Sequence, residues 1–127
     1  MKKQAIAEAD KWFSLYIRER DKACVLAGDC AGPLQCGHLF PRSRYATRWS
    51  PEAAFCQCER HNNLHEENPE PFKAWFIANY GREKYDILEY TSRRPMILKE
   101  YAIRELAERF RAELLSIREQ EDIQPRV

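Results

Sequence analysis

The chain has 127 residues, of which 44% are hydrophobic and 32% charged, and its formal net charge is +1. This length predicts one domain over residues 1–127. The sequence has no run of about 18 apolar residues, so we expect no membrane partner, and the small net charge argues against a uniformly basic nucleic-acid-binding protein. The start, Met-Lys-Lys-Gln-Ala-Ile-Ala-Glu-Ala-Asp, is acidic and helical rather than signal-peptide-like, so the cytosol is the expected compartment.

The first expected element is a helix over residues 4–22, followed by an irregular segment. Residues 24–33 contain two glycines and a proline and cannot form a long regular element. Residues 34–40 predict a short strand that Pro41 interrupts, and residues 45–49 predict either a returning strand or an irregular loop. The helix has its apolar residues at three- and four-residue spacing, namely Ile6, Ala9, Phe13, Tyr16 and Ile17.

The second half of the chain is expected to be helical. Ser50-Pro51-Glu52 resembles a helix start or turn with a capping serine, and Gly81 is a suitable C-terminal cap. Phe72, Trp75 and Phe76 are expected in the core. Further helices are expected over residues 58–67, 71–80, 82–90 and 95–119.

The last of these helices has a predicted apolar stripe, and the tail after Ile123 is expected to fray. We therefore divide the chain into an N-terminal helix (1–23), a central segment (24–68) and a helical extension (69–122). Amphipathic helices at both ends make a two-fold homodimer a reasonable expectation. The stripe consists of Leu98, Ala102, Leu106, Phe110, Leu114 and Ile117.

All five cysteines lie between Cys24 and Cys58, and all three histidines lie between His38 and His65. An odd number of cysteines argues against a closed disulfide framework. Their concentration in one irregular segment predicts a metal site. The alternative is that several of these residues are small buried apolar side chains.

A structural Zn²⁺ would supply folding free energy to a segment with few large apolar residues. The C-x-x-H spacing of one pair lets two side chains from one turn reach a single ion, whereas the other pair is more widely spaced. Cys36 and Cys56 are reserve candidates, since each lies two residues from a better one. The four expected zinc ligands are Cys24, Cys30, Cys58 and His61.

Several short segments occur in an order typical of one nuclease family, the NinG (Rap) recombination nucleases of lambdoid phages, which belong to the HNH superfamily. The similarity covers roughly residues 10–90. It includes an aromatic residue at Phe72 and the pair Tyr80-Gly81. The segments that resemble the family are Gln35-Cys36-Gly37-His38, Arg48-Trp49, Gln57-Cys58-Glu59-Arg60-His61-Asn62 and Asn68.

The resemblance implies a bacterial or prophage-encoded, metal-dependent DNA endonuclease that acts on branched recombination intermediates. It implies an α+β fold, in which an HNH ββα-metal centre with a zinc knuckle is flanked by N- and C-terminal helices. By the same resemblance His38 is the general base, Cys58 and His61 are zinc ligands, and Asn62 is a ligand of the catalytic metal ion.

Three positions depart from the family pattern. His61 stands where the family has the second knuckle cysteine, which zinc tolerates. Gln35 replaces an aspartate, so this position brings no carboxylate. Ala53 replaces the asparagine expected on the second strand, which would leave His38 without its usual orienting partner.

The residues also suit this chemistry directly. Hydrolysis of a phosphodiester needs an activated water and stabilised charge on the phosphate. The His38 imidazole can accept a proton near neutral pH, and His38 and Asn62 together with His65 or Glu66 could hold one Mg²⁺ or Mn²⁺ ion. The alternatives are that His38 is a zinc ligand or a packed core residue, that Asn62 is a helix cap, and that His65 and Glu66 are merely solvated.

Arg42, Arg44 and Arg48 lie in a stretch without acidic residues and predict a DNA-binding surface. They could instead form a solvated loop, with Arg48 buried against Trp49. Because no long basic recognition helix is evident, substrate shape is the expected selector. The competing hypotheses are a non-catalytic, zinc-stapled DNA- or protein-binding module and a zinc-dependent ribonuclease.

Overall fold

The computed structural model describes residues 1–123, and the tail expected to fray lies outside them. In this part of the chain the fold is α+β, mostly helical with one two-stranded sheet, which confirms the α+β part of the expected fold; the HNH ββα-metal centre stays a prediction. The elements are α1 (Lys2–Asp21), β1 (Leu34–His38), α2 (Tyr45–Arg48), the 3₁₀ turn η1 (Pro51–Ala53), β2 (Ala54–Cys58), α3 (Glu59–Glu67), α4 (Glu70–Tyr80), α5 (Arg82–Ser92) and α6 (Glu100–Ile123).

The two strands pair antiparallel, with Leu34 opposite Cys58 and His38 opposite Ala54. The other edge of β2 is held by the end of α1 and the loop that follows it. The Cys56 N–H donates to the Asp21 carboxylate at 2.8 Å, and the Val25 N–H donates to the Cys56 carbonyl at 2.9 Å. Backbone groups on both edges of β2 therefore have hydrogen-bond partners, as a buried strand requires.

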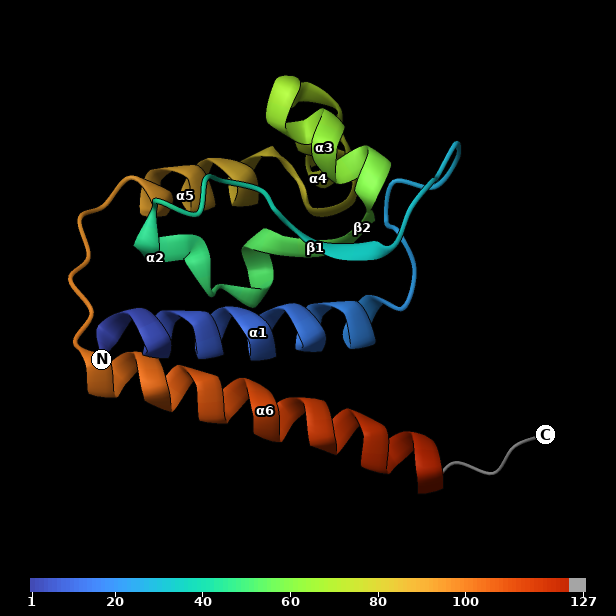
Figure 1. Cartoon of the computed structure of the whole chain (residues 1–127). Helices are drawn as coiled ribbons and strands as arrows, with labels where there is room; N and C mark the ends of the chain where they lie inside the picture. The colour runs from blue at the N-terminus through green and yellow to red at the C-terminus, as the bar shows by residue number, and fades with distance from the viewer. Residues whose placement is uncertain (124–127) are drawn as a thin grey trace.

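The sheet lies between two helical layers (Figure 1). Helices α1 and α6 run side by side and parallel on one face, and α3, α4 and α5 lie on the other. Ion pairs at both ends of the α1–α6 pair fix the parallel direction: the Met1 amino group contacts Glu100, and Arg118 contacts Glu19. One core cluster fills the α1–α6 contact and includes Ala5, Ala9, Phe13, Ile17, Ile103, Ala107 and Phe110.

Because the apolar stripes of the terminal helices pack against each other within one chain, they lend no support to the expected homodimer, which stays a prediction. A second core cluster lies on the opposite face of the sheet, under α4 and α5. It contains Phe72 and Phe76 as expected, whereas Trp75 is only partly buried against it. None of the helices described in residues 1–123 is apolar over enough of its length to cross a membrane.

The expectation for residues 45–49 is wrong. This segment is neither a strand nor an irregular loop; it forms the short helix α2, which brings Tyr45 and Trp49 together with ring centroids 5.9 Å apart. The second strand lies further on, at Ala54–Cys58, and all five of its residues are buried. A strand buried on both faces lacks the alternation of polar and apolar residues by which a strand is detected in a sequence.

The last helix begins five residues later than expected. Residues 95–99 form an extended link in which the Ile97 side chain is 90% exposed, and α6 starts at Glu100. The predicted stripe also differs in register. Phe110 and Leu114 are buried as expected, but the buried positions one and two turns before Phe110 are Ala107 and Ile103, respectively. Ala102, Leu106 and Ile117 are only partly buried.

Candidate functional site

Four side chains converge where the loop after α1 meets the start of α3. Their ligand atoms all lie within 4.8 Å of one another. The His61 Nδ1 is 3.4 Å from the Cys24 Sγ, 3.7 Å from the Cys30 Sγ and 3.1 Å from the Cys58 Sγ. Ligand atoms around a tetrahedral zinc ion are separated by about 3.5 Å. The four expected zinc ligands therefore lie together, and three thiols with one imidazole could hold a zinc ion.

The backbone around this cluster explains how distant ligands meet. The N–H groups of Glu59 and Arg60 donate to the carbonyls of Pro33 and Ala31 at 2.9 and 3.1 Å, so the first turn of α3 holds the end of the loop. Gly32 permits this close approach, because a Cβ at its position would lie 2.6 Å from the Glu59 Cβ. These contacts place the loop that bears Cys24 and Cys30 next to the start of α3, where Cys58 and His61 lie.

The cluster also favours ionised sulfur at one position. Burial opposes ionisation of Cys58, but backbone hydrogen bonds from His61 and Ala31 and the neighbouring thiols outweigh it and lower the pKa of Cys58 to about 6. Burial and the thiols of Cys24 and Cys58 raise the pKa of Cys30 to about 11. A thiolate at Cys58 is the form that binds zinc.

Cys36 and Cys56, the reserve candidates, lie outside this cluster and opposite each other on β1 and β2. Cys36 packs against the core cluster of α1 and α6, and Cys56 is fully buried. Burial raises the pKa of these thiols to about 12 and about 11. For these two residues the alternative interpretation, small buried side chains, fits the structure.

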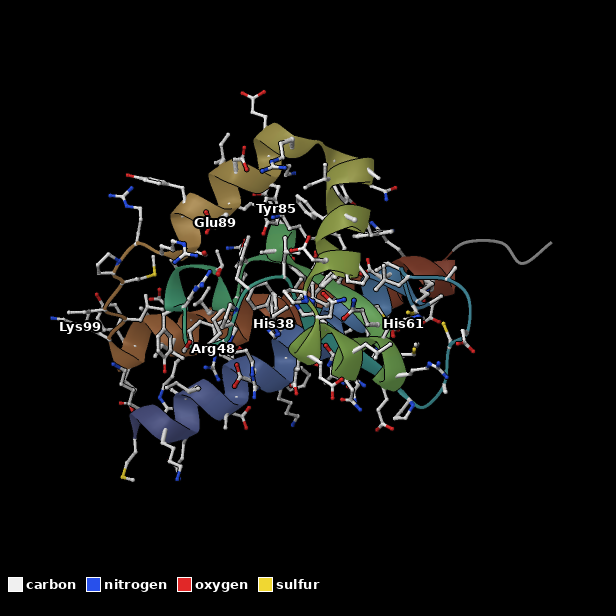
Figure 2. The ribbon with its side chains drawn as sticks, turned by 90° about the horizontal axis from the view of Figure 1, so that it is seen from above. His38, Arg48, His61, Tyr85, Glu89 and Lys99 are labelled. Atoms are coloured by element: carbon white, nitrogen blue, oxygen red, sulfur yellow. The ribbon has the colours of Figure 1, made fainter. Side chains whose placement is uncertain are left out.

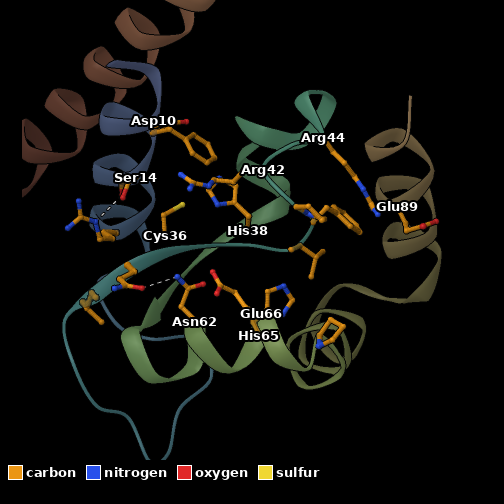
Figure 3. A pocket seen from close by; sticks show the side chains of 18 of the residues that line it. Asp10, Ser14, Cys36, His38, Arg42, Arg44, Asn62, His65, Glu66 and Glu89 are labelled. Atoms are coloured by element: carbon orange, nitrogen blue, oxygen red, sulfur yellow. Dashed lines mark hydrogen bonds between the residues drawn. The ribbon is translucent and has the colours of Figure 1, made fainter. Parts of the chain in front are cut away.

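Most of the other candidate residues line one pocket of about 1030 Å³ beside the sheet; Arg48 is not part of its lining. The pocket is bounded by α1, β1, α3 and α5, and Figure 3 shows the side chains that face it. His38, Asn62, His65 and Glu66 all belong to its lining. His38 comes from β1 and the other three residues come from α3.

His38 points from β1 toward α1 (Figure 3). Its Nε2 lies 3.0 Å from the Arg48 carbonyl, so this nitrogen carries the proton and donates it, and Nδ1 is left as the basic nitrogen. The ring also packs 5.8 Å from the Phe13 ring, centroid to centroid. His38 lies away from His61 (Figure 2) and outside the zinc-type cluster, which leaves no support for its alternative role as a zinc ligand.

The partner of the His38 ring is a backbone group, the Arg48 carbonyl. The resemblance to the NinG nucleases predicts an asparagine side chain in this role. Burial lowers the pKa of His38 to about 4, although the hydrogen bond to Arg48 acts in the opposite direction. The imidazole is therefore neutral at pH 7, the form in which it can accept a proton.

Asn62 and Glu66 lie on α3, on the other side of β1 from the His38 ring (Figure 3). The Asn62 Nδ2 donates to the Gln35 Oε1 at 2.9 Å, which leaves the Asn62 Oδ1 to act as an acceptor. The helix-cap alternative for Asn62 is excluded, because the cap of α3 is Cys58, whose Sγ accepts from the His61 N–H.

His65 also lines the pocket, and its ring contacts α4. Its ring packs edge-on against Phe72, with centroids 4.9 Å apart, and burial lowers its pKa. Its Nδ1 is buried and has no hydrogen-bond partner among the described residues. Asn62 and Glu66 lie one helical turn apart on α3 and both line the pocket, whereas the His65 ring is packed against Phe72.

The three arginines of the predicted DNA-binding surface have different environments. Arg42 is exposed at the pocket, and Arg44 lines it while donating to the Ser92 hydroxyl at 3.1 Å. Arg48 is held by the Asp10 carboxylate, with its Nη2 2.7 Å from Oδ2, and its guanidinium lies over the Trp49 ring. This agrees with the alternative that Arg48 is buried against Trp49.

Several relevant residues are not identifiable from the sequence. Arg18 on α1 and Arg93 after α5 also line the pocket, but nothing distinguishes them from other charged residues of their helices. Gln57 is fully buried, and its amide has no partner in the described part of the chain. It occupies the space over Gly37, where a Cβ would lie 2.2 Å from the Gln57 Oε1.

The lowered pKa of His38 predicts a specific dependence of stability on pH. Because the folded pKa of about 4 is below the value of about 6.5 for an exposed histidine, neutral His38 stabilises the fold above pH 6.5. About 3 kcal/mol of this contribution is lost as the pH falls toward 4. Urea unfolding between pH 4.5 and 7 should show a shallower pH dependence for His38→Gln than for the wild type. Equal pH dependences for the two proteins would show that His38 does not have a lowered pKa in the folded state.

No protein-family model, curated protein or solved structure matches this chain. The resemblance to the NinG nucleases therefore rests on the motif residues themselves.

Proposed function

We propose that the chain is a metal-dependent DNA endonuclease of the HNH (ββα-metal) type that hydrolyses phosphodiester bonds, with branched recombination intermediates as its substrates. The observation that carries this proposal is that His38, Asn62 and Glu66 line the same pocket of about 1030 Å³. It lies beside a hairpin and helix whose junction bears the Cys₃His cluster. In this proposal the cluster binds a structural zinc ion and fixes α3 against the loop.

His38 is the proton acceptor in this mechanism. Its Nε2–H is held by the Arg48 carbonyl, so the ring presents Nδ1 for a proton from the attacking water. A pKa of about 4 would make it a weak base in the free protein. The negative charge of a phosphodiester bound nearby raises the pKa of an imidazole toward the range in which proton transfer is efficient.

The opposite wall of the pocket supplies oxygen ligands. The Asn62 Oδ1 and the Glu66 carboxylate would hold Mg²⁺ or Mn²⁺, ions that prefer such ligands. When bound, the ion stabilises charge on the phosphate and on the departing oxygen. The His38 ring and these oxygens line the same pocket from the two sides of β1, and in this proposal the phosphate binds in that pocket between them.

Arg42 and Arg44 would contact DNA phosphates at the rim of this pocket. Replacing both by alanine should lower DNA affinity about tenfold or more at 100 mM salt. It should also reduce the slope of log K against log salt by about two, because each lost phosphate contact releases about one counterion fewer. Fluorescence anisotropy in EDTA-free buffer without Mg²⁺ or Mn²⁺ measures both quantities.

The matched control for this pair is Arg104→Ala with Arg109→Ala, two exposed arginines on α6. The control should retain wild-type affinity and salt slope. Equal losses in the two double variants would mean that binding reflects net charge rather than this rim.

The proposed activity is tested with the full-length, zinc-loaded protein and Mn²⁺ or Mg²⁺. Supercoiled plasmid, a synthetic four-way junction, linear duplex and RNA of matched sequence are offered in parallel. We expect nicking or cleavage of DNA, with the junction cut fastest. If every DNA substrate stays intact at micromolar protein, the enzyme proposal is wrong, and cleavage of RNA alone would favour the ribonuclease.

A second candidate is a zinc-stapled DNA- or protein-binding module without catalysis. The hydrogen bond from Asn62 to Gln35 favours it, because this bond joins α3 to β1 and gives Asn62 a structural role. The two candidates predict different results when DNA cleavage and DNA binding are measured for the wild type and for a Gln35 variant. Gln35→Ala should leave cleavage within a few fold of wild type in the enzyme, whereas the module would bind DNA and never cut it.

A further inference from the structure

The Asp10 carboxylate on α1 holds the segment that lies over His38. It accepts from the Arg48 Nε at 3.1 Å and from the Arg48 Nη2 at 2.7 Å. It also accepts from the Trp49 Nε1 at 2.9 Å. The third nitrogen of the Arg48 guanidinium donates to the Arg42 carbonyl at 3.0 Å. A single carboxylate is thus tied to two consecutive residues, and through Arg48 to the start of the same loop.

These contacts are more constrained than an ordinary surface ion pair. The side chains of Arg48 and Asp10 are only 13% and 26% exposed. The two N–H groups of the guanidinium meet the two carboxylate oxygens in the paired arrangement that fixes direction as well as distance. The Tyr45 ring also lies 5.4 Å from the guanidinium carbon and limits its movement.

The same residue, Arg48, provides the partner of His38 through its backbone. Arg48 is the last residue of α2, and the final carbonyls of a helix have no partner within it. Its carbonyl is therefore available, and it accepts the Nε2–H of His38 at 3.0 Å. Arg48 is therefore hydrogen-bonded to Asp10 through its side chain and to His38 through its carbonyl, so this one residue links α1 to the imidazole.

We propose that Asp10 is a positioning residue: by fixing Arg48 it holds the carbonyl that orients His38 with Nδ1 toward the pocket. The catalytic importance of this orientation rests on the proposed function, but the orientation itself does not. Asp10 acts through Arg48 and need not touch the substrate. Without it, the carbonyl would move, and the His38 ring would rotate in a pocket open to solvent.

The test follows the ring proton of His38 in the full-length, zinc-loaded protein. Nitrogen-15 NMR detects the Nε2–H, which is assigned by its disappearance in His38→Gln. We expect Asp10→Asn to speed exchange of this proton with water at least tenfold, while the backbone amides of β1 keep their wild-type protection. A purely structural role for Asp10 would instead change both together or neither.

The matched control is Glu8→Gln, which removes another carboxylate from the same helix. Glu8 accepts only an exposed hydrogen bond from the Trp12 Nε1, so exchange at His38 should stay within twofold of wild type. If Asp10→Asn does not fold, Arg48→Lys serves in its place, because lysine keeps the charge but not the paired N–H groups. Unchanged ring protection in whichever variant folds overturns the proposal.

Cleavage provides an independent readout. In an active enzyme, Asp10→Asn should lower kcat by about 10- to 100-fold and leave the DNA dissociation constant within twofold. If the wild type does not cleave DNA but the ring exchange changes as expected, the proposed function fails and the positioning role stands. If the wild type cleaves and ring exchange is unaffected, the positioning role fails alone.

Discussion

Replacing Cys58 by serine should lower the melting temperature of the zinc-loaded protein by roughly 15–25 °C. Structural zinc contributes folding free energy well above the total stability of many domains, and a loss of about 5 kcal/mol produces a shift of this size. Serine is a good helix N-cap, so it can replace the cap that the Cys58 Sγ forms with the His61 N–H. The loss therefore reports on metal binding. Calorimetry with and without a zinc chelator measures it.

The matched control is Cys36→Ser, which alters a cysteine outside the cluster. Its melting temperature should fall by only a few degrees, and it should still lose the same 15–25 °C on chelation. Cys58→Ser should be insensitive to the chelator. If the wild type itself is insensitive and contains no zinc after expression in zinc-supplemented medium, the Cys₃His cluster is not a zinc site.

Replacing His38 by alanine should lower the rate of DNA cleavage by about 100- to 10,000-fold, the usual contribution of a general base. Binding should change little, because the proposed phosphate contacts come from Arg42 and Arg44 and not from the imidazole. Initial rates at saturating junction DNA with Mn²⁺ measure the effect. Anisotropy measures the affinity of the same preparation.

The control for His38→Ala is a fold comparison. The ring of His38 packs against Phe13, so some loss of stability is expected, and both proteins are assayed at least 15 °C below their transitions. His65→Ala is the matched histidine variant. Its ring packs on Phe72 rather than on the Asn62–Glu66 pair, so it should retain cleavage within tenfold. Equal activity in wild type and His38→Ala would refute the role of His38 as base.

The zinc-type cluster could be predicted from the sequence because its signal is local. Cys58 and His61 lie one helical turn apart, and a loop too poor in apolar residues to fold alone supplies Cys24 and Cys30. The N-terminal helix was also predictable, since its apolar spacing is regular and its observed bounds, Lys2–Asp21, differ by at most two residues at either end.

Other features depend on tertiary contacts that no local pattern encodes. Strand β2 is buried on both faces, so its sequence carries no alternation to detect. The partner of His38 is a backbone carbonyl, and every residue has one. The role of Asp10 depends on Arg48, 38 residues away, and an acidic residue on an amphipathic helix is ordinarily solvated.

In the proposed mechanism one pocket holds a divalent cation beside His38, and a separate zinc site fixes α3. Element-specific anomalous scattering from crystals of the zinc-loaded protein, grown with Mn²⁺ and a short DNA junction, locates both ions. We predict zinc at Cys24, Cys30, Cys58 and His61, and manganese bound by oxygens of Asn62 and Glu66 with the His38 Nδ1 facing the same phosphate. A DNA-bound pocket without manganese, or a phosphate out of reach of His38, would contradict the account.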